Sequence, residues 1–219
     1  MLVVSPHCDD AVFACGRLLE AHPGSIVVTV CAGRPSPDVA LTEWDRAAGF
    51  QPGDDVMGVR RKEDQRALTL LWAHPLWLDF CDSQYRPPPS RETVMETLHQ
   101  VVSATHIATI VLPLGLFHSD HVLTHDATLL LRPRHPRLSW FLYADALYRR
   151  LPGLVEARLK ECASAGLTLQ PAAFPVNPLT SRKQAAVECY QSQLRALSTP
   201  GRPGYVDTAS EETFWRIAS

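Results

Sequence analysis

The sequence predicts an α/β domain built on a mostly parallel sheet with helices on both faces. Short apolar runs that suit strands alternate with longer segments whose apolar residues recur at helical spacing, as in parallel sheets with crossover helices. Two of these runs, Ser25–Ala32 and Ile107–Leu114, are almost continuously apolar, as in strands covered on both faces. No internal repeat, charge block or linker divides the chain, so we expect one domain over residues 1–219.

The boundaries of the elements follow from these runs and from the residues that interrupt them. Pro23 and Gly24 end the first predicted helix, and Pro133 follows the fourth. The predicted strands are Leu2–Ser5, Ser25–Ala32, Pro75–Phe80, Ile107–Leu114 and Ser139–Ala144, with an extended segment at Thr168–Val176. The predicted helices are Asp9–His22, Val59–Trp72, Arg91–Ala104, His121–Leu130, Leu154–Ala165, Ser181–Leu197 and a short terminal helix at Glu211–Ile217. The long polar segment Gly33–Gly58 reads as a loop, and because loops of this length usually have a function, we place it near the mouth of the site.

The composition excludes several classes of protein. With 46% hydrophobic and 20% charged residues, the chain can bury a substantial core. Its net charge of -2 gives no electrostatic reason to expect binding to nucleic acid or to an anionic membrane, and no apolar run approaches the roughly 20 residues of a membrane span. The six cysteines form no C-x-x-C pair, which argues against a zinc knuckle and favours reduced, mostly buried thiols in a cytoplasmic protein.

A first cluster of chemically active residues lies between the first strand and the first helix. It consists of Ser5-Pro6-His7-Cys8-Asp9-Asp10, at the carboxyl end of a strand, where open α/β sheets bind their ligands. His7 and Asp10 are close enough in sequence to bind one metal ion, with Asp9 beside them as a carboxylate base. The alternative is that Asp9 or Asp10 only caps the helix.

A second cluster follows another predicted strand. His118-Ser119-Asp120-His121 comes after Ile107–Leu114, and the carboxyl ends of parallel strands share one edge of the sheet, so the two clusters can meet. Imidazole and carboxylate donors from His7, Asp10 and His121 would hold a catalytic zinc and leave a fourth position for water. Asp9 could then accept a proton, and His118 could stabilise an oxyanion or protonate a leaving nitrogen.

The alternative for this second cluster is that its histidines are polar loop residues. His125 lies one helical turn beyond His121, and we expect it to pack rather than to bind a metal.

These motifs resemble those of the PIG-L/LmbE-like family of zinc-dependent N-deacetylases. His7-Cys8-Asp9-Asp10 is similar to the family's His-Pro-Asp-Asp motif, with Cys8 in place of the usual Pro, and His118-Ser119-Asp120-His121 is similar to its His-x-Asp-His motif. Weaker similarities, in the family's order, occur at Arg60–Asp64, Leu78–Asp82, Tyr143–Tyr148 and Lys183–Gln193.

The resemblance implies a Rossmann-like fold, one zinc or other divalent ion per chain, and a role for each matching residue. It implies that His7, Asp10 and His121 bind the zinc, that Asp9 is the general base and that His118 faces the oxyanion. It also implies that Asp120 orients a neighbouring histidine. Arg60 and Asp82 match positions that hold sugar hydroxyls.

The function expected from the residues and the resemblance together is hydrolysis of an N-acyl group, acetyl in the first instance, from an amino sugar or a sugar-bearing small molecule. The residues alone support a metal-assisted hydrolase of an amide or ester, so a non-sugar metabolite is an alternative substrate. A non-catalytic module that binds a metal or ligand is a third reading. A covalent mechanism fits poorly, because no G-x-S-x-G elbow occurs. The sequence leaves the oligomeric state open, a homo-oligomer included.

Overall fold

A seven-stranded sheet with the strand order β3-β2-β1-β4-β5-β7-β6 forms the centre of the computed structural model, which describes residues 1–175 and 182–218. The strands are β1 Leu2–Ser5, β2 Ile26–Thr29, β3 His74–Trp77, β4 Thr109–Pro113, β5 Ser139–Tyr143, β6 Leu169–Ala172 and β7 Phe214–Ile217. The first five strands are parallel to one another, whereas β7 lies between β5 and β6 and is antiparallel to both. The α-helices are α1 Asp10–Ala21, α2 Glu43–Ala47, α3 Val56–Leu70, α4 Arg91–Ala104, α5 Ser119–Leu129, α6 Leu154–Ser164, α7 Arg182–Val187 and α8 Gln191–Leu197.

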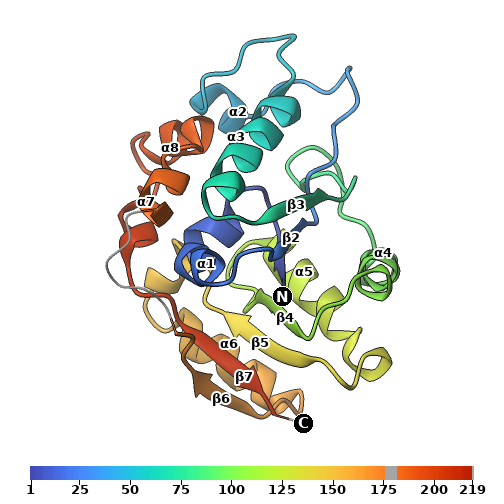
Figure 1. The fold of residues 1–219 in the computed structure, drawn as a ribbon. Coiled ribbons are helices and arrows are strands. Elements are labelled where there is room, and N and C mark those ends of the chain that lie inside the picture. Colours follow the sequence, from blue (N-terminus) through green and yellow to red (C-terminus); the bar gives the residue numbers. More distant parts are fainter. Residues whose placement is uncertain (176–181, 219) are drawn as a thin grey trace.

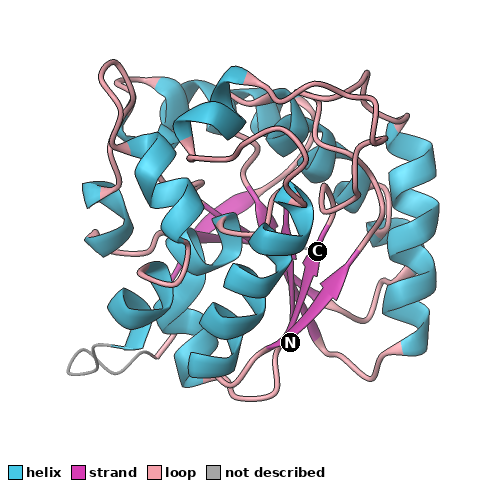
Figure 2. Cartoon of the chain, turned by 90° about the horizontal axis from the view of Figure 1, so that it is seen from above, coloured by secondary structure: helices cyan, strands magenta, loops and turns pink. Residues whose placement is uncertain are grey.

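Helices cover both faces of this sheet (Figures 1 and 2). Successive residues of a strand point to opposite faces, so Val3 of β1 packs with α1, α3 and α7, whereas Leu2 and Val4 pack with α4, α5 and α6. Each face therefore has its own apolar core. The predicted fold class, an α/β domain with a mostly parallel sheet and helices on both faces, is confirmed.

Several predicted boundaries are wrong in instructive ways. The terminal segment is the strand β7 and not a helix, because Phe214 packs in one core and Trp215 and Ile217 in the other, while its backbone pairs with β5 and β6. The predicted helix Ser181–Leu197 is two helices, α7 and α8, and its first residue, Ser181, lies outside the described residues, as does Val176 at the end of the extended segment. The long polar segment contains α2 and the first turn of α3.

The first helix is bent, and the end of the chain supports the bend. Cys15 has non-helical backbone angles, which leaves the N–H groups of the following turn without helical acceptors. Both carboxylate oxygens of Glu212 accept from these groups, at 2.8 Å from the Arg17 nitrogen and 3.0 Å from the Leu18 nitrogen. Lys183 donates to the same carboxylate at 2.8 Å. The C-terminal segment thereby fixes the helix whose start carries the first predicted cluster.

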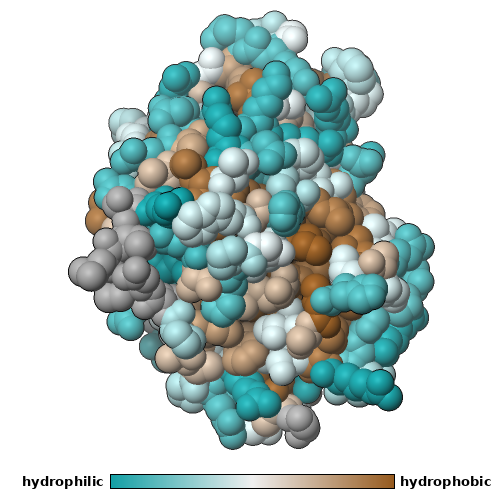
Figure 3. Space-filling model, in the orientation of Figure 1, coloured by the Kyte–Doolittle hydropathy of each residue, from teal (hydrophilic) through white to brown (hydrophobic). Residues whose placement is uncertain are grey.

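The state of the cysteines and the character of the surface agree with what the sequence predicts. All six thiols are free, and all but Cys189 are buried. On the face shown in Figure 3, hydrophobic side chains form limited patches between hydrophilic ones. Within the described part of the chain, no helix combines the length and the apolar character that crossing a membrane requires.

Candidate metal centre and active site

The two predicted clusters meet at the carboxyl edge of the parallel strands. The loop after β1, with the start of α1, carries His7, Asp9 and Asp10, and the loop after β4, with the start of α5, carries His118 to His121. The loops after β3 and β5 add Asp82 and Asp145. Because all four strands run in the same direction, their ends bring these side chains to one place.

Three of these residues form a compact set of metal donors. His7 Nδ1 lies 3.1 Å and His121 Nε2 lies 3.2 Å from the same oxygen, Oδ2 of Asp10. Donor atoms of all three residues lie within 4.8 Å of one another. Two imidazoles and a carboxylate are ligands that zinc accepts, at about 2.0–2.2 Å each, and three protein ligands leave a position open. The residues present therefore fit a divalent ion of the zinc type.

A second donor set shares His7 with the first. His7, Asp82, His118 and Asp120 also have donor atoms within 4.8 Å of one another. His7 Nε2 lies 3.1 Å from Asp120 Oδ2 and 3.7 Å from Asp82 Oδ2. A neutral imidazole has one N–H and one lone pair, so His7 cannot serve both sets at once. With its Nε2–H donated to Asp120, the Nδ1 lone pair faces Asp10 and the first set.

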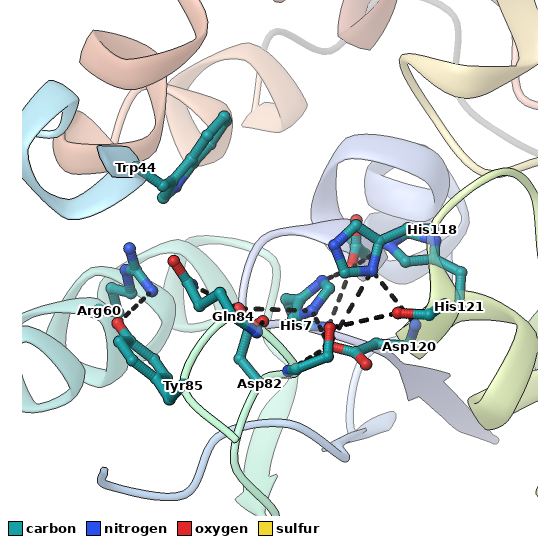
Figure 4. A network of polar contacts seen from close by, with 12 residues as sticks. His7, Trp44, Arg60, Asp82, Gln84, Tyr85, His118, Asp120 and His121 are labelled. Atoms are coloured by element: carbon teal, nitrogen blue, oxygen red, sulfur yellow. Dashed lines mark hydrogen bonds and ion pairs between the residues drawn. The ribbon is translucent and has the colours of Figure 1, made fainter. Parts of the chain in front are cut away.

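Asp120 is well placed for the orienting role that the resemblance implied. Its carboxylate is buried, and the oxygen that contacts His7 also accepts from the Ser83 backbone nitrogen at 3.0 Å. The neighbouring histidine that it contacts is His7, because His118 Nδ1 lies 4.0 Å from it. Figure 4 shows the three imidazoles gathered together, with Asp82 and Asp120 beside His7.

Asp145 contacts the far side of His121, and our sequence analysis assigned it no role. His121 Nδ1 lies 2.6 Å from Asp145 Oδ1, and the other oxygen of this fully buried carboxylate accepts from the Gly115 nitrogen at 3.0 Å and the Leu116 nitrogen at 3.3 Å. A proton on Nδ1 leaves the Nε2 lone pair facing Asp10. The sequence does contain a signal for this residue, because Asp145 directly follows the predicted strand Ser139–Ala144 and falls in one of the weaker motif similarities, Tyr143–Tyr148.

The adjacent carboxylates Asp9 and Asp10 have opposite electrostatic surroundings. Burial, together with the negative charge of Asp10, raises the pKa of Asp9 to about 7. Burial also acts on Asp10, but the charges and hydrogen bonds of His121 and His7 outweigh it and lower the pKa of Asp10 well below its usual range. Asp9 is the N-cap residue of α1, yet its side chain makes no capping hydrogen bond. A carboxylate that exchanges a proton near neutral pH suits a general base.

The histidines divide in a similar way. Burial opposes protonation of His121, but Asp10 and Asp145 raise its pKa to about 9, and the surrounding carboxylates also raise the pKa of His7. Burial and the neighbouring imidazoles lower the pKa of His118. His118 caps α5 by accepting from the Asp120 nitrogen at Nδ1, 3.2 Å away, so its neutral form carries the proton on Nε2. This N–H is free to act as a donor in the site.

The site opens into a cavity of about 330 Å³. Arg60 and Asp82, the predicted sugar-binding residues, both line it. The Arg60 guanidinium pairs with the buried Asp45 at 2.8 Å, and Asp82 accepts from the Gln84 side chain at 2.6 Å. The segment around α2 thus reaches the cavity, as we expected of the long loop, and it supplies Trp44 to the lining. His125 is buried and bonded through Nδ1 to the Pro113 carbonyl at 2.8 Å, in agreement with the packing role predicted for it.

Comparisons with known proteins agree with this arrangement. The model of the PIG-L family, described as GlcNAc-PI de-N-acetylase, matches residues 2–131, more than half of the chain. A search of curated proteins gives no significant match.

Solved structures of deacetylases share the fold over almost the whole chain. A triple mutant of a deacetylase in the teicoplanin biosynthetic pathway is 26% identical, with a TM-score of 0.82 over 99% of this chain and 97% of that one. The A40926 pseudoaglycone deacetylase Dbv21 is 24% identical, with a TM-score of 0.80 over 99% and 95%. The zinc-inhibited form of teicoplanin deacetylase Orf2 is 23% identical, with a TM-score of 0.78 over 99% and 97%. The matched residues 2–131 include both His/Asp clusters, which the fold brings together at one edge of the sheet. This chain therefore belongs to the PIG-L family of de-N-acetylases.

Proposed function

We propose that the protein is a metal-dependent hydrolase that removes an N-acyl group, acetyl in the first instance, from an amino sugar or a sugar-containing small molecule. The observation that carries the proposal is the convergence of His7, Asp10 and His121 within 4.8 Å of one another, beside Asp9 and His118 in one cavity. Family membership supports the deacetylase chemistry, and the deacetylases of similar fold support a sugar-bearing substrate.

The three convergent side chains would hold the ion, zinc or another divalent metal, one per chain. Such an ion lowers the pKa of a water molecule and polarises an acyl carbonyl. Asp145 and Asp120 each accept an N–H from one of the two ligand histidines and so keep the lone pair of each directed at the ion position.

The remaining residues would move protons and bind the substrate. Asp9, with its pKa near 7, accepts the proton of the attacking water. The His118 Nε2–H would donate a hydrogen bond to the carbonyl oxygen as negative charge develops there. The proton that Asp9 takes from the water would then pass to the leaving nitrogen. Asp82 and Arg60 lie on the side of His7 away from His121 (Figure 4), where a carboxylate and a guanidinium can hold several hydroxyls.

A panel of N-acetylated amino sugars and their glycosides, assayed for released acetate and free amine, tests the proposal. Release should stop on treatment with a chelator and return when zinc is added back. Zinc should be titrated both below and above one equivalent, because one protein of similar fold has been solved in a zinc-inhibited form. Activity that survives complete removal of metal, or no release from any N-acyl sugar, would contradict the proposal.

A further inference from the structure

Two residues with strained backbone conformations, Phe117 and Leu147, both line the cavity. Three non-glycine residues of the described chain have positive φ: Phe117 at 62°, Leu147 at 70° and Trp72 at 55°. Trp72 follows α3, away from the cavity lining, whereas Phe117 and Leu147 belong to that lining. Bulky side chains rarely adopt this conformation, and such strain concentrates at functional sites.

Phe117 is held in its strained conformation by a tight turn. The His118 nitrogen donates to the Leu116 carbonyl at 2.7 Å, so Phe117 is the central residue of a γ-turn of the rare left-handed kind. Glycine or asparagine would fit this backbone at lower cost. The phenyl ring gains little burial in return, because Phe117 is 70% exposed. Neither the backbone nor the core explains an aromatic residue here.

The exposed ring is one part of an apolar wall beside the metal donors. Phe117 stacks on Tyr148, with ring centroids 5.3 Å apart and planes 26° apart, and the Tyr148 ring meets His121 edge-on at 5.2 Å. Leu147 adjoins Tyr148, and its backbone nitrogen is fixed by Asp207 at 2.7 Å. We call Phe117, Leu147 and Tyr148 the aromatic wall.

The position of the aromatic wall indicates which part of a substrate it meets. Asp82 contacts His7, whereas Tyr148 contacts His121, so the polar lining and the aromatic wall lie beyond different members of the metal-donor set. An amide bound at that set with its sugar toward Asp82 directs its acyl carbon chain the other way. From this geometry, and resting on the proposed function, we infer that the aromatic wall is a subsite for an apolar N-acyl chain longer than acetyl.

Binding of N-hexanoylglucosamine and N-acetylglucosamine, measured by calorimetry, tests the subsite without requiring turnover. The measurements use the metal-loaded Asp9→Ala protein, in which hydrolysis should be slow. Burial of about two of the added methylenes corresponds to a preference of about 10-fold or more for the hexanoyl compound, equivalent to about 1.4 kcal/mol or more. Adding Phe117→Asn should reduce the preference to less than about 3-fold, and Phe117→Leu should retain most of it.

Trp72→Asn is the matched control, because it replaces an exposed aromatic residue of positive φ outside the cavity lining. It should leave the chain-length preference unchanged. The thermal midpoint of Phe117→Asn should equal or exceed that of the parent, which separates loss of a subsite from loss of the fold. Equal binding of the two compounds, or a preference that survives Phe117→Asn, would overturn the inference. A hexanoyl preference in binding, together with no acid release from either compound by the metal-loaded wild-type protein, would support the subsite and count against the proposed hydrolysis.

Discussion

Asp145→Asn changes one buried atom and should disable His121 as a metal ligand. Asp145 Oδ1 lies 2.6 Å from His121 Nδ1, and its other oxygen accepts from two backbone nitrogens, those of Gly115 and Leu116. In the variant, the amide oxygen keeps those two hydrogen bonds, and the amide NH₂ then faces Nδ1. Nδ1 must accept, the proton moves to Nε2, and the lone pair that faces Asp10 is lost.

The expected loss of zinc affinity is about 10–100-fold, or roughly 1.4–2.7 kcal/mol, which is the usual effect of removing an outer partner of a ligand histidine. Competition with a chromophoric chelator measures this affinity directly. The pKa of His121 is about 9 in the metal-free wild type, so nitrogen NMR of the imidazoles should be recorded above that pH, where the ring is neutral. It should then show the proton on Nδ1 in the wild type and on Nε2 in the variant. Circular dichroism should show a folded variant, because the two backbone donors remain satisfied.

Two comparisons make this result specific. Asp126→Asn alters a half-exposed carboxylate on α5, the helix that carries His121. This carboxylate lies 3.4 Å from Arg158, and its replacement should leave zinc affinity unchanged. Asp145→Ala leaves two buried N–H groups without acceptors and should also destabilise the fold, by about 1–3 kcal/mol for each. Wild-type zinc affinity in Asp145→Asn would refute the reasoning about the His121 tautomer.

Three further changes test other parts of the account. Asp9→Ala should retain zinc and lower kcat by about 10²–10⁴-fold, since it removes a general base; loss of zinc would instead make Asp9 a ligand. Asp82→Ala should weaken turnover of an N-acetyl sugar at unchanged metal content, and wild-type kinetics would contradict a sugar-binding role. Asp64 is fully buried, and burial raises its pKa to about 7, so the folded state binds a proton here that the unfolded state releases near pH 4. Its contribution to stability therefore falls as the pH rises toward 7. Asp64→Asn should reduce the loss of unfolding free energy between pH 5 and 8 by about 3 kcal/mol, measured by urea denaturation, and an unchanged pH profile would contradict a raised pKa.

Most strands and helices, and the meeting of the two His/Asp clusters, could be predicted from the sequence, because both depend on patterns within short segments of the chain. A strand followed by His7–Asp10 and another followed by His118–His121 are visible in the sequence, and the parallel sheet brings their ends together. The convergence of His7, Asp10 and His121 was predicted from that reasoning alone. The roles of the individual residues in catalysis remain predictions.

Features that depend on distant partners could not be predicted in this way. Four residues, Phe214–Ile217, do not distinguish a helical period from an alternating one, and only pairing with β5 and β6 makes them a strand. The break between α7 and α8 occurs near Tyr190, whose hydroxyl donates to Asp64 at 2.8 Å, far away in sequence. The buried pair of Arg60 with Asp45 depends in the same way on how α2 and α3 pack.

The zinc content of the purified protein and of His121→Ala tests the central claim most directly. After dialysis against limiting zinc, metal analysis should find about one zinc per wild-type chain and far less in His121→Ala, because two donors hold the ion much more weakly than three. A second variant, His125→Ala, removes another buried histidine of α5, one that does not belong to the donor set. This variant should keep its zinc. Equal zinc content in wild type and His121→Ala would contradict the metal centre on which the account depends.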